Sequence, residues 1–459
     1  MTSQIPPHVA SRAAGVIGRS RAAAFPPVPS RGPVTFAVVL AHLGWFAAAM
    51  AYLLLVPAGA SRWDRVWAED GRVWMGDALT LGFPASILEP LDGYFHTVPR
   101  LISQVAITLP IETWPFAISV MTAAVRAALA LVIYAASRPY VPSRIGRWAI
   151  AGAIIWLPSA NAETIGNAAN LHWFLFYGAF WLLLWRLNTW WGTTLQAIAL
   201  LAVATSLPMG LALLPIAAAR IVFLSGRLRV AGIVWAAGAA VAVPSLLTSD
   251  RERAPLQFVE WLLSTAVRGP LETLIGPQLT FLLVGGTVDA VVVAVTLLAV
   301  GVIVALAIAA IAARRSSALL IGTLLFYGAF AVAFPLYANW KEELWIADPL
   351  KGERYSAAST LFFFAAIVVS IGVIGVRHHR FAQFCGAGVL TAVLAGVGAQ
   401  IVYPPINEGS AILSGRTWSE SIAEGRGTCD ASESARLLVL PHDGWWVDVP
   451  CVLLTNVDE

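Results

Sequence analysis

Charged residues are scarce in this chain. They make up 12% of its 459 residues, about half the share found in a soluble domain, whereas 58% of the residues are apolar and the mean hydropathy is +0.75. This composition excludes a disordered chain, a coiled coil and an ordinary cytosolic enzyme. The chain also lacks a basic block and its net charge is only +3, which argues against nucleic acid as a partner. A polytopic membrane protein remains.

Apolar runs of spanning length are what the sequence contains instead. Six runs are clear: Phe36–Val56, Trp114–Ala136, Ala290–Ala312, Ala318–Phe334, Thr360–Val376 and Cys385–Val402. Five shorter ones follow Trp148: Trp148–Pro158, Leu171–Leu187, Thr193–Ser206, Leu211–Leu224 and Val230–Val243. Together they predict an all-α polytopic membrane protein with about 11 transmembrane helices, some of which end early beside a cavity.

The distribution of charge predicts the orientation of these helices. Residues 1–33 contain four arginines and no acid, and their composition is that of a flexible cytoplasmic tail. About half of the 29 Lys and Arg residues fall in this tail and in short loops on the same side. All 26 acids fall on the other side or at its border, where Asp289 lies. We therefore expect a multi-pass protein of the cytoplasmic (inner) membrane, with the N-terminus inside and the C-terminus outside.

Two further regions follow from this topology. Residues 34–403 form the transmembrane domain, with a long outer loop at 58–112, and residues 404–459 form a small extracytoplasmic lid. Alternating patterns at Ala435–Leu440 and Trp445–Val452 predict a strand pair in the lid. Cys429 and Cys451 also lie there, and a disulfide between them would stabilise the lid by about 3 kcal/mol. Two free thiols are the alternative.

The first outer loop is the most informative segment. Glu69 and Asp70 are adjacent acids a few residues beyond the first span, and apolar residues farther along the loop predict juxtamembrane amphipathic helices. A carboxylate at this depth can serve as a general base for an attacking hydroxyl, and a nearby arginine can bind a phosphate. The alternative is that the two acids cap a surface helix or simply solvate the loop.

This layout resembles the GT-C superfamily of integral-membrane glycosyltransferases. The resemblance covers residues 34–403 and places Glu69-Asp70 where the acidic motif of that superfamily stands, in the loop after the first helix. It implies a sugar donor carried on polyprenyl phosphate and a catalytic carboxylate in the first outer loop. We expect Asp70 to be the base, because Gly71 permits a sharp turn beside it, with Glu69 as the second candidate.

Two other outer segments supply candidate ligands for the substrates. Asn167, Asn170, His172 and Trp173 crowd a short bend between two spans and, with His96 of the first loop, are candidates for binding the acceptor or the sugar. Helix capping is the alternative for the asparagines. No second histidine lies at ligand spacing from His172, so no metal site is predicted there. Asp70 with Asp77 could still hold a divalent cation through oxygen ligands.

The donor phosphate is expected where a helix returns into the membrane. Arg354 and Tyr355 begin that helix, Lys351 precedes it, and the helix dipole favours an anion there. An Arg-Tyr pair at this place resembles the phosphate contact of several GT-C enzymes, and Arg100 of the first loop is a further candidate. The alternative is an interfacial anchor, since Tyr and Arg both favour that depth.

Three functions compete. The first is transfer of one sugar from polyprenyl phosphate to a cell-envelope glycan, a lipid-linked glycan or a protein, by an inverting displacement that needs a single base. The second is a transporter or lipid flippase, for which Arg126, deep in an apolar run, is the best single residue. The third is a membrane scaffold, which offers no reason for acids and arginines to gather in the outer loops.

Overall fold

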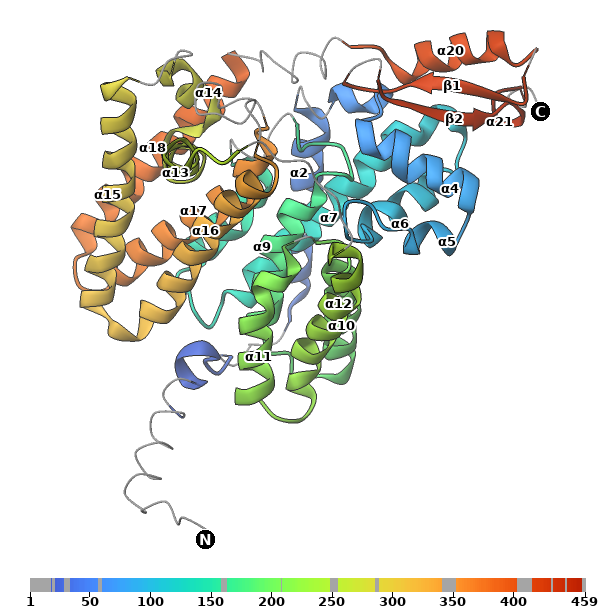
Figure 1. Ribbon diagram of the computed structural model, residues 1–459. Coiled ribbons are helices and arrows are strands. Elements are labelled where there is room, and N and C mark those ends of the chain that lie inside the picture. Colours follow the sequence, from blue (N-terminus) through green and yellow to red (C-terminus); the bar gives the residue numbers. More distant parts are fainter. Residues whose placement is uncertain are drawn as a thin grey trace.

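The computed structural model is a helical bundle with a small two-stranded sheet at one end (Figure 1). It describes residues 18, 21–28, 34–56, 60–157, 163–207, 209–247, 255–284, 289–340, 352–402, 415–430, 432–441 and 444–455. We call the end that carries the first loop and the C-terminal tail the loop end. Residues 21–28 lie at the opposite end (Figure 1).

Seven helical stretches in the described residues are long and apolar enough to cross a membrane. They correspond to α2 (Phe36–Leu55), α7 (Trp114–Ala136), α12 (Val230–Leu247), α15 (Ala290–Ala313), α16 (Ala318–Ala338), α17 (Arg354–Gly375) and α18 (His379–Val402). An all-α, multi-pass membrane architecture is therefore plausible, in agreement with the hydropathy pattern.

The number of crossings predicted from sequence is not confirmed. Each of the eleven apolar runs contains a helix, but four of these helices are short: α8 (Arg144–Trp156), α9 (Leu171–Leu184), α10 (Trp190–Ala204) and α11 (Leu214–Phe223). The longest of them has 15 residues and is about 22 Å long, less than the roughly 30 Å of a hydrocarbon core.

Helix α9 explains how a short helix can still be central. All 14 of its residues are buried, and its sequence is apolar on every face, so it needs neighbours all round. Helices α7, α17, α10 and α11 supply them. Because α9 starts at Leu171, the bend that precedes it lies inside the protein at the loop end. That bend carries several of the polar residues discussed below.

The first loop folds into short helical pieces that pack on the bundle. They are η1 (Ser61–Asp64), the π-helical η2 (Asp70–Met75), α4 (Gly76–Leu81), α5 (Ala85–Leu88) and α6 (Thr97–Ala106). Helix α6 is amphipathic. It buries Ile102 and Ala106 but exposes Leu101 and Val105, as a helix lying against lipid would.

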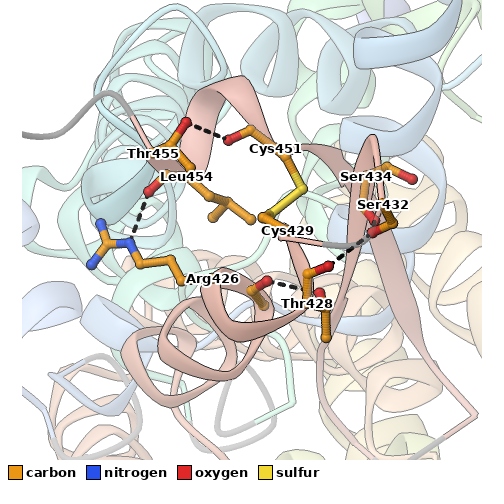
Figure 2. Close-up of a disulfide and its surroundings, with 9 residues drawn as sticks. Arg426, Thr428, Cys429, Ser432, Ser434, Cys451, Leu454 and Thr455 are labelled. Carbon is orange, nitrogen blue, oxygen red and sulfur yellow. Dashed lines mark hydrogen bonds between the residues drawn. A yellow bond between two sulfur atoms is a disulfide. The ribbon is translucent and has the colours of Figure 1, made fainter.

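The tail forms the two strands that its alternating sequence predicts. Strands β1 (Ser434–Leu438) and β2 (Trp446–Pro450) pair antiparallel, and α20 (Trp418–Thr428) and the short α21 (Val452–Thr455) pack against them. A disulfide joins Cys429, after α20, to Cys451, before α21 (Figure 2). Ser432 and Arg426 bond to neighbouring carbonyls and tie this corner together.

Backbone hydrogen bonds join the tail directly to the first loop. The Ala68 amide donates to the Leu440 carbonyl at 2.7 Å, and the Leu440 amide donates to the Val66 carbonyl at 3.0 Å. Val439 packs so closely on Gly71 that a Cβ there would lie 2.8 Å from its methyl carbon. The tail therefore fixes the segment that contains the acidic pair.

Part of the stretch predicted as a flexible tail is docked on the bundle. Phe25 is 2% exposed and belongs to the core. Its carbonyl accepts a hydrogen bond from Arg186, and the Ala24 carbonyl accepts one from Tyr140. The buried Phe25 ring and these two hydrogen-bonded carbonyls hold residues 21–28 in place. The composition of the N-terminal stretch did not predict this docking.

Candidate functional site

A cavity of about 190 Å³ lies at the loop end, where four parts of the chain meet. The first loop contributes one wall, the bend before α9 a second, and the ends of α16 and α17 the others. Its polar and aromatic lining residues include Glu69, Asp92, His96, Asn170, His172, Trp173, Arg354 and Tyr355. Predicted site residues from three distant segments are thus brought together.

Glu69 is the acid of the predicted motif that faces this cavity. It lies just before η2, half-buried, and lines the cavity together with Arg354. Burial raises the pKa of the Glu69 carboxyl, and the nearby positive charge of Arg354 partly offsets that rise. A carboxylate whose pKa is raised is a stronger proton acceptor than an ordinary surface glutamate.

Asp70 faces a different way and has a different set of partners. Its carboxylate accepts hydrogen bonds from the amides of Ala168 at 3.0 Å and Ala169 at 2.8 Å, and its side chain is absent from the cavity lining. Burial raises the pKa of Asp70 to about 7, against the effect of these two bonds. The structure thus gives Asp70 the position of a group that anchors the bend to the first loop.

Arg354 is held at the start of α17 by an acid from the bend. Its guanidinium pairs with Glu163, and its backbone amide donates to the same carboxylate at 3.2 Å. Glu163 is 4% exposed, whereas a third of the Arg354 side chain remains accessible and lines the cavity. The pair orients one basic group toward the cavity beside Glu69.

Aromatic rings form much of the remaining wall. Trp173 lies edge-on to Tyr355 at 5.6 Å between ring centroids, and its indole N–H donates to Asn170. His172 contacts Trp173, and its Nδ1 bonds the Ala169 carbonyl at 2.7 Å. Flat rings next to polar groups suit a sugar, which presents both hydroxyls and an apolar face.

His96 completes the wall from the first loop. Its ring contacts those of Tyr94 and Trp74 in tilted arrangements, with centroids 3.7 Å and 4.4 Å apart. His96 and Asp92 both have positive φ, of 53° and 52°, a conformation that non-glycine residues adopt at a cost. Both residues line the cavity, so this part of its wall carries backbone strain that the surrounding contacts must hold.

Three other predicted residues do not line the cavity or cannot be placed. Arg100 pairs with Asp77 at 2.6 Å and lies over the Trp74 ring at 4.7 Å, so it supports the wall from behind. Asn167 donates to the Glu163 carbonyl and accepts from the Asn170 amide, which shapes the bend. Lys351 lies outside the described residues.

The sequence alone indicates no site role for Asp92, which lines the cavity, or for Glu163, which holds Arg354 beside it. An acid in a bend between two apolar runs, as Glu163 is, can be noticed in the sequence. Its ion pair with Arg354 across the bundle cannot be predicted from sequence spacing. Asp92 precedes Gly93 in a turn, which is an ordinary surface pattern. Only the fold places it at the cavity.

The two acids considered for a cation have separate partners. Asp70 binds backbone amides, whereas Asp77 binds the Arg100 guanidinium. Within the described part of the chain, no group of three or more His, Cys, Asp and Glu side chains is placed to hold a metal ion.

Arg126, the residue singled out for transport, is engaged within the bundle. Its Nε and Nη2 donate to the Ile154 carbonyl at 3.2 and 2.6 Å, and its guanidinium lies 3.9 Å from the centre of the Phe174 ring. These contacts explain why an arginine is buried in α7: its side chain links α7 to α8 and α9.

Comparisons with known proteins add no family to this description. No protein-family model, curated protein or solved structure matches the chain.

Proposed function

We propose that the protein is a GT-C-type membrane glycosyltransferase that moves a sugar from polyprenyl phosphate to an acceptor hydroxyl, with Glu69 as the general base. The observation that carries the proposal is the meeting of Glu69 and Arg354 in one cavity at the loop end of a bundle of apolar helices. A base and a phosphate-binding group at membrane depth are the two groups that this reaction requires.

The reaction would be a single inverting displacement. The acceptor oxygen attacks the anomeric carbon of the donor while the bond from that carbon to the phosphate oxygen breaks. Glu69 takes the proton of the acceptor hydroxyl. The polyprenyl phosphate leaves as an anion, which Arg354 and the N-terminus of α17 stabilise. The aromatic wall of Trp173 and Tyr355 would hold the sugar.

The charge distribution supports an extracytoplasmic place for this reaction. The arginine-rich loops lie at the end opposite the cavity, and basic loops mark the cytoplasmic side. The acceptor would then be a cell-envelope glycan, a lipid-linked glycan or a protein. The transporter alternative retains Arg126 as its residue to test.

The decisive experiment compares Glu69→Gln with two other variants of the same loop. Purified protein is given a panel of radiolabelled polyprenyl-phosphate sugars and a cell-envelope acceptor fraction. We expect Glu69→Gln to fold and to lose transfer by a factor of about 10²–10⁴, because the amide cannot take the proton. Glu89→Gln, an exposed glutamate of the same loop, is the matched control and should transfer like the wild type.

Asp70→Asn separates the two acids. We expect it to transfer within about tenfold of the wild type per folded molecule, because Asp70 anchors the bend and does not line the cavity. Full loss in folded Asp70→Asn with activity in Glu69→Gln would return the base to Asp70. Absence of transfer by the wild type with every donor would favour the transporter, and flux in vesicles with Arg126→Leu would be tested next.

A further inference from the structure

A second cavity lies at the opposite end of the same helices. It has a volume of about 540 Å³ and lies among α9, α11 and α16, with Phe25 of the N-terminal segment at its end. Its lining is almost wholly apolar: Phe180, Leu184, Ile216, Ala219, Leu319 and Phe326 are examples. A cavity of this chemistry inside a bundle of apolar helices suits hydrocarbon and offers nothing to a sugar.

A row of phenylalanines on α16 runs between the two cavities. Phe326 lines the apolar cavity, Phe334 lines the cavity with Glu69, and Phe330 lies between them. The rings stack in sequence, with centroids 6.2 Å apart for Phe326 and Phe330 and 5.2 Å apart for Phe330 and Phe334. Spacing of four residues puts all three on one face of the helix.

This row lies on the outside of the bundle. Phe326 is 58% exposed and Phe334 is 38% exposed. Large aromatic side chains arranged this way leave a continuous apolar stripe between the cavities. From Ala338 at one cavity to Leu319 at the other, α16 rises about 29 Å, close to the roughly 30 Å thickness of a hydrocarbon core.

We propose that this stripe, from Phe334 through Phe330 and Phe326 into the apolar cavity, binds the polyprenyl chain of the donor and selects long chains over short ones. The inference rests on the proposed function for the identity of the lipid. The stripe is continuous with the proposed phosphate site: that site begins at Arg354, and the stripe runs from the same cavity along α16 to the apolar cavity. A short prenyl chain would not reach that pocket.

The end of the pocket is built by contacts already described. Arg186 and Tyr140 bind the carbonyls of Phe25 and Ala24, which keeps Ala23–Phe25 in place as its floor. Gly322 of α16 lines the pocket and has open space where a side chain would stand. A bulky residue at 322 would therefore fill the pocket with little effect on the surrounding packing.

The test is competitive binding by native mass spectrometry on the purified full-length protein. The probes are long-chain polyprenyl monophosphate and a short-chain prenyl monophosphate, each without sugar. We expect the wild type to prefer the long chain. Gly322→Phe should reduce this preference at least about tenfold, because the long chain loses contact with the protein over roughly two methylene groups. Binding of the short chain should stay unchanged.

Gly301→Phe is the matched control, because Gly301 is also an open glycine of a spanning helix, α15, and lies away from both cavities. Phe330→Ala is a second variant, which removes the middle ring of the stripe. It should also reduce the preference for the long chain. An unchanged preference in Gly322→Phe and Phe330→Ala would overturn the proposal. So would a bound phospholipid that polyprenyl phosphate does not displace.

Failure of this inference and failure of the proposed function give different results. If Glu69-dependent transfer occurs but the preference for the long chain is unchanged in Gly322→Phe, the stripe is not the chain site and the enzyme class stands. If the long-chain preference is present and depends on Gly322 while no donor supports transfer, the lipid site stands and the glycosyltransferase proposal fails.

Discussion

At the scale of single residues, adjacent acids have opposite surroundings. Glu69 faces the cavity and Arg354, whereas Asp70 holds the amides of Ala168 and Ala169. The sequence predicts an acidic motif in the first outer loop, and both acids belong to that loop. It cannot tell which of the two faces the cavity, because that depends on the π-helical turn that starts at Asp70.

Asp70 should make stability depend on pH. Its pKa is about 7 in the folded protein and 3.8 for the free group, so the folded state binds the proton more tightly. A raised carboxyl pKa contributes stability that is full below about pH 4 and is lost as the pH rises through about 7. We expect the melting temperature of the wild type to fall over this range, with a smaller change in Asp70→Asn.

The same substitution should lower stability at every pH. An asparagine can accept one of the two backbone amide bonds, but its NH₂ group would oppose the other, at a cost of about 1–3 kcal/mol. The measurement is thermal unfolding followed by intrinsic fluorescence in detergent. An Asp70→Asn protein as stable as the wild type, with the same pH profile, would show that the anchoring of the bend is unimportant.

At the scale of elements, the tail and the first loop form one unit. Gly71 tolerates the contact with Val439 only because it has no Cβ. We expect Gly71→Ala to displace Val439 or η2, and so to reduce transfer by about tenfold or more, as small displacements of a catalytic group do. Val439→Ala should restore part of the activity in the double variant. The measurement is the transfer assay, with folding checked by thermal unfolding.

A matched control exists in the same helix cluster. Gly76 lies five residues on, with only a distant backbone oxygen near its Cβ position, so Gly76→Ala should transfer like the wild type. If Gly71→Ala and Gly76→Ala behave alike, or if Val439→Ala fails to relieve the defect, the tail does not position the acidic pair. The strands themselves were predictable from alternation, whereas their docking on residues 66–71 was not.

At the scale of the whole molecule, hydropathy predicts the class of fold but not the number of crossings. Runs such as Leu171–Leu187 satisfy a composition rule, yet the helix they form is only 14 residues long and wholly enclosed. Distances across the bundle decide the site as well. Glu163 and Arg354 pair although 191 residues separate them, and no local pattern carries that information.

Orientation can be checked on the intact cell. With Cys385 replaced by Ala, Glu89→Cys places a thiol at the loop end and Ser316→Cys places one at the end of α15 and α16 that carries arginines. We expect a membrane-impermeant maleimide to label position 89 in whole cells, and position 316 only after permeabilisation, because basic loops stay in the cytoplasm. The reverse pattern would invert the proposed topology.

The contact between the first loop and the C-terminal tail also determines when during synthesis the site can form. Arg72 binds the carbonyl of Gly444, and 372 residues separate the two. At roughly 5–20 residues per second, a ribosome needs on the order of 20–75 s to make the chain between them. During that interval the acidic pair lacks the strand that holds it. An unfinished or truncated chain should therefore occupy the membrane without a working site, and activity should begin only when synthesis is nearly complete.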